Sequence, residues 1–125
     1  MNKYLIVGVG SALGGMLRYW LSNFVYKFLQ PIFPFGTLAV NILGTFLLGI
    51  IFFFLDSQEL LSPSMRIFLT IGLCGGLTTF STFSYETFIF IEDTQYLFAF
   101  LNILSNIILT LLSLALAYLI STKLF

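Results

Sequence analysis

The chain has 125 residues, of which 59% are apolar or aromatic and 8% are charged, whereas about 25% of the residues in a soluble domain are charged. Five Lys and Arg residues balance five Asp and Glu residues, so there is no net charge to attract nucleic acid. The sequence has no His and one Cys, Cys74, which excludes imidazole catalysis, His-ligated metals, an internal disulfide and a Cys-based zinc site. These features exclude most soluble enzymes.

Long apolar segments separate the charged residues, and a segment of about 20 such residues can cross a bilayer as a helix. Residues 28–55 and 94–122 are free of charge, as are residues 67–85, and residues 4–26 hold only Arg18. The sequence therefore predicts an all-α integral membrane protein with four transmembrane helices, at residues 4–28, 36–55, 64–91 and 95–122. Because little sequence is left over, residues 1–125 are expected to form a single transmembrane domain.

The N-terminus and the positive charges bear on membrane insertion. There is no separate charged region followed by a short apolar stretch and a cleavage site, so we expect no removable signal peptide and retention of Met1. With four crossings, Lys3, Arg66 and Lys123 fall on one side and Lys27 on the other. This weak bias favours a single orientation with both termini in the cytoplasm. The alternative is insertion both ways, with antiparallel self-pairing.

Small residues recur in the first two predicted helices at spacings that let helix backbones approach closely in lipid. They are Gly8, Gly10, Ala12, Gly14 and Gly15 in the first helix and Gly36, Gly44 and Gly49 in the second. We expect nearly all of these glycines to serve helix packing. Because four helices enclose little space, a pore would need more than one chain.

Two predicted helices carry polar stripes at four-residue spacing, which places each stripe on one helix face. The stripes are Thr37, Asn41 and Thr45 in the second helix, and Asn102, Asn106 and Thr110 in the fourth, with Ser105 and Ser113 nearby. A polar group in hydrocarbon needs a partner or a watery path. The stripes indicate either interhelical hydrogen bonds or a lined route, and three stacked groups favour the route.

The third predicted helix contains glycines at positions 72, 75 and 76, near its centre. Each costs a helix about 1 kcal/mol relative to Ala, and Ser62 followed by Pro63 already provides the start signal of this segment. We expect the helix to unwind at these glycines near the bilayer midplane and to resume near Thr79. Freed carbonyls could hold a cation, and the new helix N-terminus could face an anion. The alternative is a glycine kink used only for packing.

Two aromatic residues follow this predicted break. Phe80 and Phe83 lie one helical turn apart, with Ser81 and Thr82 between them. The electron-poor edges of phenyl rings can replace part of the water around an anion without trapping it. The alternative is that both rings belong to the core or face lipid, as most of the sixteen Phe residues would.

Two charged residues lie well inside the predicted helices, away from their ends, where a charge is a functional candidate. Arg18 is in the first helix and Glu86 in the third. Arg18 could instead snorkel or pair with an acid in a linker, and Glu86 lies only two turns from the end of its helix.

These motifs resemble the Fluc (CrcB) family of fluoride channels over essentially the whole chain. The resemblance rests on Gly-Gly-Met-Leu-Arg-Tyr at 14–19, Gly-Thr-Leu-Ala-Val-Asn at 36–41 followed by Gly44, and Gly-Gly-Leu-Thr-Thr-Phe-Ser-Thr-Phe-Ser at 75–84 followed by Glu86. It implies a homodimer of two oppositely oriented copies with two parallel pores, in place of the single orientation that the charges favour. It also implies passive export of fluoride across the plasma (inner) membrane of a prokaryote, and fluoride resistance.

The resemblance also implies roles for individual residues. The fluoride path would comprise Phe80, Phe83, Asn41, Ser81, Thr82, Asn106, Thr110 and Glu86, with Arg18 at the aqueous vestibule. Ring edges of the two Phe residues would face fluoride, and the Asn41 amide would donate a hydrogen bond beside them. The backbone carbonyls of Gly75 and Thr78 from each copy would hold one structural sodium ion at the dyad. A relay or gating role for Glu86 is a hypothesis. Leu114 departs from the family's polar track, for which Ser113 is a candidate substitute.

Two functions of other classes remain open. A small four-helix proton-coupled multidrug antiporter needs an acidic residue in its first helix, where this sequence has Arg18. A noncatalytic membrane accessory subunit would only pack against a larger partner. Fluoride efflux from liposomes that contain only the purified protein separates these two functions from a channel.

Overall fold

The structure is a computed structural model that describes residues 2–123, in which all the regular secondary structure is helical. Four segments are long and apolar enough to cross a membrane: Lys3–Val25, Phe35–Asp56, Pro63–Glu92 and Tyr96–Lys123. They confirm the four predicted transmembrane helices, so the chain is a multi-pass membrane protein. The expectation for Met1 concerns a residue outside the described range.

The four segments comprise both α-helices and two short π-helices. The first segment is α1 (Lys3–Val25) and the last is α6 (Tyr96–Lys123). The second consists of α2 (Phe35–Ile50) and the π-helix η1 (Ile51–Asp56). The third consists, in order, of α3 (Pro63–Ile67), the π-helix η2 (Phe68–Cys74), α4 (Gly75–Leu77) and α5 (Phe80–Glu92).

Side-chain caps begin two of these segments. The Asn2 side chain accepts a hydrogen bond from the Tyr4 amide at 3.0 Å at the start of α1. The Ser62 hydroxyl accepts one from the Met65 amide at 3.2 Å at the start of α3, where Pro63 follows it. An oxygen at this position satisfies one of the amides that have no partner within the helix. The start signal predicted at Ser62 and Pro63 is confirmed.

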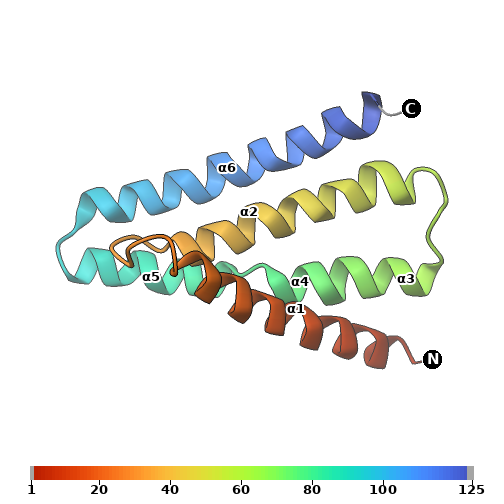
Figure 1. The fold of residues 1–125 in the computed structure, drawn as a ribbon, viewed down its shortest axis with the longest axis horizontal. Coiled ribbons are helices and arrows are strands. Elements are labelled where there is room, and N and C mark those ends of the chain that lie inside the picture. Colours follow the sequence, from red (N-terminus) through yellow and green to blue (C-terminus); the bar gives the residue numbers. More distant parts are fainter. Residues whose placement is uncertain (1, 124–125) are drawn as a thin grey trace.

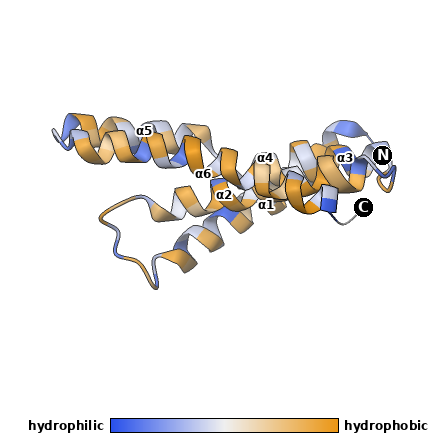
Figure 2. Ribbon diagram, turned by 90° about the horizontal axis from the view of Figure 1, so that it is seen from above, coloured by the Kyte–Doolittle hydropathy of each residue, from blue (hydrophilic) through white to orange (hydrophobic). Residues whose placement is uncertain are grey.

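The helices form a bundle in which α2 lies between α6 and the row of α3, α4 and α5, and α1 runs obliquely along that row (Figure 1). Both ends of the described chain lie at the same end of the bundle as the loop between α2 and α3 (Figure 1). Apolar residues predominate along the long helices (Figure 2), and many large apolar side chains are exposed, including Ile71 at 60% and Leu111 at 62%. This surface suits lipid or another helix and not water.

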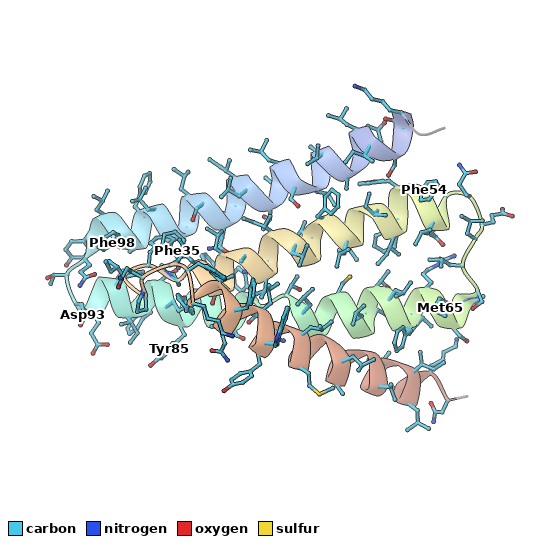
Figure 3. The ribbon with its side chains drawn as sticks, viewed as in Figure 1. Phe35, Phe54, Met65, Tyr85, Asp93 and Phe98 are labelled. Atoms are coloured by element: carbon cyan, nitrogen blue, oxygen red, sulfur yellow. The ribbon has the colours of Figure 1, made fainter. Side chains whose placement is uncertain are left out.

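An aromatic cluster lies at the end of the bundle opposite to the two ends of the described chain. The ring of Phe33, in the loop before α2, lies 5.1 Å from that of Phe35, 6.2 Å from that of Phe90 and 6.3 Å from that of Phe98, measured between centroids. Figure 3 shows Phe35 and Phe98 together at this end, close to Asp93 in the turn between α5 and α6. The cluster joins α2, α5 and α6, and such ring pairs stabilise a packing beyond the area they bury.

Glycines let α1 approach the third segment at backbone distance. A Cβ atom on Gly10 would lie 2.7 Å from the carbonyl oxygen of Phe68 and 2.9 Å from the Cα atom of Gly72. A Cβ atom on Gly76 would lie 2.6 Å from the carbonyl oxygen of Ser11. Side chains larger than hydrogen do not fit at these positions, so the packing role predicted for glycines is confirmed for Gly10. Gly8 has open space, with nothing within 4 Å of an added Cβ atom.

The third segment is interrupted near its middle, as predicted, but the prediction that it unwinds at its glycines is wrong. Gly72 lies in η2, and α4 begins at Gly75. The residues outside the helices are Thr78, with φ −83° and ψ 157°, and Thr79, with φ −151° and ψ 122°. Gly72 and Gly76 retain helical geometry and fit against α1, and side-chain hydrogen bonds stabilise the backbone at the two threonines.

Candidate functional site

The break between α4 and α5 is held by the hydroxyl of Thr79, the N-cap of α5. Thr79 Oγ1 accepts a hydrogen bond from the Thr82 amide at 3.2 Å and donates one to Thr82 Oγ1 at 3.1 Å. It also lies 3.2 Å from Ser81 Oγ. The predicted path residues Ser81 and Thr82 therefore contact the cap of α5.

Asn41 on α2 reaches the same break with both ends of its amide. Its Oδ1 accepts a hydrogen bond from the Thr79 amide at 2.8 Å, and its Nδ2 donates to the Thr79 carbonyl at 3.1 Å and to Asn106 Oδ1 at 3.0 Å. The side-chain oxygen thus replaces the helical acceptor that the Thr79 amide lost at the break. It also brings α2, α5 and α6 together at one point.

A groove of about 410 Å³ opens beside this point. It is lined by Asn41, Thr45, Thr78, Thr79, Phe80, Phe83, Asn106, Ile107, Thr110 and Leu111. Five of the residues predicted for the fluoride path lie together here: Asn41, Phe80, Phe83, Asn106 and Thr110. The lining combines amides, hydroxyls and rings and has no charged side chain among the described residues.

The two aromatic rings of this groove differ in exposure. The ring centroids of Phe80 and Phe83 are 5.4 Å apart, with an interplanar angle of 55°. Phe83 is buried at 9% exposure, whereas Phe80 is 78% exposed. One ring therefore belongs to the core of this chain, and the other projects from it.

Glu86 lies outside the groove, although it belongs to the predicted path. Its Oε1 accepts a hydrogen bond from Thr37 Oγ1 at 2.6 Å, and its Oε2 is buried with no hydrogen-bond partner among the described residues. It lines a separate cavity of about 320 Å³, together with Tyr26, Pro34 and Tyr85 among others. Tyr85 itself points away from the bundle (Figure 3). The geometry thus places Glu86 next to the loop that precedes α2.

Arg18, predicted at the vestibule, contacts the end of α4. Its Nε donates a hydrogen bond to the Gly76 carbonyl at 2.8 Å, and its Nη2 donates to the same oxygen. The carbonyls at the C-terminal end of a helix lack intrahelical partners and carry partial negative charge. Arg18 therefore caps the first half of the broken segment. The acid at the end of η1, Asp56, forms its ion pair with Arg66, at 2.8 Å.

The carbonyl oxygens of Gly75 and Thr78 have lost their helical donors. The Thr79 amide, which would complete the helical bond to Gly75, donates to Asn41. The Thr82 amide, which would bond Thr78, donates to Thr79 Oγ1. Carbonyl oxygens suit a hard cation. Among the described residues there is no cluster of three or more His, Cys, Asp or Glu that could hold a metal.

Sequence reasoning missed the side chains of Thr78 and Thr79, and it did not assign Thr45, Ile107 and Leu111 to the path. Thr79 had a local signal, since threonine is a preferred N-cap residue at a helix start. Thr45 belongs to the polar stripe of α2. Ser113, the candidate substitute in the polar track, is not among the residues that line the groove and donates to the Ile42 carbonyl at 2.8 Å. Of the two roles predicted for polar residues, Ser113 therefore has the interhelical hydrogen bond and does not line the groove.

Comparison with known proteins gives matches over nearly the whole chain. Residues 5–118 match the family described as CrcB-like protein, Camphor Resistance (CrcB). A relative from Geotalea daltonii is 49% identical over 111 residues, covering 89% of this chain and 90% of the relative. One from Pelobacter propionicus is 47% identical over 112 residues, covering 90% and 87%, and one from Trichlorobacter lovleyi is 50% identical over 112 residues, covering 90% of each. All three relatives are named fluoride-specific ion channel FluC. The matched region includes the break and the groove.

Proposed function

This chain belongs to the CrcB family, and from that membership and the uncharged groove beside its helix break we propose that it is a fluoride-selective ion channel. Fluoride passes down its gradient, and no chemical bond is made or broken, so the protein is not an enzyme. The observation that carries the proposal is the meeting of Asn41, Phe80 and Phe83 in one groove.

The chemistry of the groove suits a small, strongly hydrated anion. A narrow path must replace the water that the ion loses, and the contacts must be weak enough for the ion to move on. Hydroxyls, an amide and ring edges provide such contacts without a fixed positive charge. Because Asn41 Nδ2 already donates to Thr79 and Asn106, a passing fluoride competes with the Thr79 carbonyl for one of its hydrogens.

The pore is completed by a second copy of the chain in the opposite orientation. Phe80 is 78% exposed at the groove, and a groove with polar groups would be costly if it faced lipid directly. A second copy would cover the groove and contribute its own ring to the path. The resulting antiparallel homodimer holds two pores. Crosslinking of the chain expressed alone tests the self-pairing, and a strictly monomeric protein with fluoride flux would contradict it.

A structural sodium ion is proposed at the dyad of this dimer. The carbonyls of Gly75 and Thr78, freed from helical hydrogen bonds, would provide two oxygens from each copy. The ion would supply positive charge where two helix ends meet and so stabilise both breaks. Replacing sodium by a large organic cation should lower the thermal stability of the dimer. Equal stability in both salts would contradict this assignment.

Glu86 is proposed as a gating or relay residue at the end of the path. The unpartnered Oε2 and the adjoining cavity support a role that involves motion or proton exchange. In Glu86→Gln, fluoride flux should change in its pH dependence. If the pH dependence of flux in this variant matches that of the unmodified channel, Glu86 is not a relay residue.

The setting follows from the same chemistry. Hydrogen fluoride crosses membranes and dissociates inside the cell, so a passive channel in the inner membrane of a prokaryote exports the accumulated ion and gives fluoride resistance. The antiporter alternative loses support because α1 contains no acidic residue to couple protons.

Fluoride efflux from liposomes that contain only the purified protein tests the proposed function. We expect electrogenic fluoride efflux without a proton gradient and no comparable chloride efflux. Protein-free liposomes provide the background. Proton-dependent drug exchange would support the antiporter instead. Absence of both fluoride efflux and drug exchange would support an accessory subunit.

A further inference from the structure

A chain of side-chain hydrogen bonds runs from α5 through α6 to the helix break. Thr87 Oγ1 accepts from Asn102 Nδ2 at 2.9 Å, and Asn102 Oδ1 accepts from Asn106 Nδ2 at 3.0 Å. Asn106 Oδ1 accepts from Asn41 Nδ2 at 3.0 Å, and Asn41 Oδ1 accepts from the Thr79 amide at 2.8 Å. Thr87 and Asn102 do not line the groove, but they are joined to it through the next two amides.

In each of these hydrogen bonds, the donor and the acceptor are fixed. The single hydroxyl hydrogen of Thr87 is donated to the Phe83 carbonyl at 2.8 Å, so its oxygen can only accept. If the Asn102 amide were reversed, two acceptor oxygens would face each other. The nitrogen of Asn102 must therefore face Thr87, and its oxygen must face the nitrogen of Asn106. This arrangement leaves the Asn106 oxygen to accept from Asn41.

Burial makes this direction costly to reverse. Asn102 is fully buried at 0% exposure, and Asn106 and Thr87 are buried at 6% and 7%. At these buried positions, a reversed amide would leave unpaired polar groups in a medium of low dielectric constant, where they are most unfavourable. Thr87 thus fixes which way the Asn102 amide faces, and the Asn106 amide is held in the same sense by this amide and by donation from its Nδ2 to the Asn102 backbone carbonyl at 2.9 Å.

We propose that Thr87 and Asn102 are positioning residues for the fluoride path, which act on Asn41 through Asn106. When an ion takes the Asn41 hydrogen that now bonds the Thr79 carbonyl, the bond to Asn106 is the one that keeps the Asn41 nitrogen in place. A concerted reversal of Asn102 and Asn106 would set two nitrogens against each other and break that bond. The Thr87 hydroxyl opposes this reversal at Asn102, and the Asn102 backbone carbonyl opposes it at Asn106.

Isosteric substitution at Thr87 tests the proposal, which rests on the proposed channel function. Thr87→Val removes the hydroxyl and keeps the shape, and Thr87→Ser restores the hydroxyl. The matched control is Ser121→Ala, because the buried Ser121 hydroxyl also donates to a carbonyl four residues earlier, Ala117, at 2.7 Å. Fluoride efflux and the assembly state are measured for each protein in liposomes and by gel filtration.

We expect Thr87→Val to reduce fluoride efflux about tenfold, equivalent to about 1.4 kcal/mol, with assembly unchanged. Thr87→Ser and Ser121→Ala should stay within about twofold of the unmodified channel. If Thr87 acts through Asn102, adding Thr87→Val to Asn102→Leu should reduce efflux no further, because the chain is already interrupted. A purely structural role would instead make the two losses multiply.

Several results would overturn the inference. Efflux of Thr87→Val within about twofold of the unmodified channel would do so, as would equal losses in Thr87→Val and Thr87→Ser. If Thr87→Val does not assemble, Asn102→Leu alone decides, since an assembled variant with full efflux contradicts the proposal. An unmodified protein that carries no fluoride would overturn the proposed function itself. That result is distinct from a working channel that is insensitive to Thr87.

Discussion

Arg18 on α1 donates two hydrogen bonds to the carbonyl oxygen of Gly76 at the end of α4. The guanidinium thereby satisfies a backbone acceptor that the break at Thr78 and Thr79 leaves without a helical donor. Its positive charge also lies at the negative end of a helical segment. The sequence predicted a vestibule role for this residue, and attraction of anions by Arg18 stays a prediction.

Substitution of Arg18 separates these two roles. Because Arg18 caps the break, Arg18→Gln should lower the free energy of unfolding by about 1–3 kcal/mol and reduce fluoride efflux at every ionic strength. Arg18→Lys should retain part of both. Thermal unfolding in detergent and efflux at low and high salt are the measurements. A loss of efflux confined to low salt, with unchanged stability, would instead indicate long-range attraction of the ion.

The close approach of α1 to the third segment predicts a contrast between two glycines of the same helix. In Gly10→Ala the new methyl group would meet backbone atoms of Phe68 and Gly72 at 2.7 and 2.9 Å, so we expect destabilisation by about 1–3 kcal/mol. Gly8→Ala is the control, because its methyl group would have nothing within 4 Å. Thermal unfolding of both variants is the measurement, and equal melting temperatures would show that the contact does not limit stability.

The cap of α5 predicts a dependence on the Thr79 hydroxyl. Thr79→Val keeps the shape but removes the oxygen that bonds the Thr82 amide, so we expect a loss of about 0.5–2 kcal/mol in stability and slower fluoride efflux. Thr79→Ser retains the oxygen and should preserve both. Stability is measured by thermal unfolding and conduction by liposome efflux. If valine and serine behave alike, the extended backbone is held by Asn41 alone.

The groove predicts that Phe80 and Asn41 determine the fluoride rate. Phe80→Ile removes the ring edge, and Asn41→Asp replaces the hydrogen-bond donor by an oxygen. Each should slow fluoride efflux at least about tenfold, a barrier of about 1.4 kcal/mol, with the dimer still assembled. Phe88→Ile is the control, since Phe88 is also on α5 and 62% exposed but does not line the groove. Unchanged rates in the two groove variants would refute the assignment of both residues.

Much of the architecture could be predicted from the sequence because it depends on local properties. Long apolar runs with few charges define the four spans, and the pair Ser62 and Pro63 marks the start of α3. The resumption of helix after Thr79 also agrees with the prediction. Four-residue spacing predicted that Asn41 and Asn106 each belong to a polar stripe on one helix face, and the structure shows that the two residues meet.

Hydropathy, spacing and motif resemblance determined that this chain crosses the membrane four times and belongs among fluoride channels. Tertiary structure decided where the third segment breaks, that Glu86 lies apart from the groove, and that Thr87 is joined to Asn41 through two amides. The physical reason is that the residues that meet in these contacts lie far apart along the chain. Length, charge and periodicity are properties of neighbouring residues, whereas the partner of a buried amide is set by which helix packs against it.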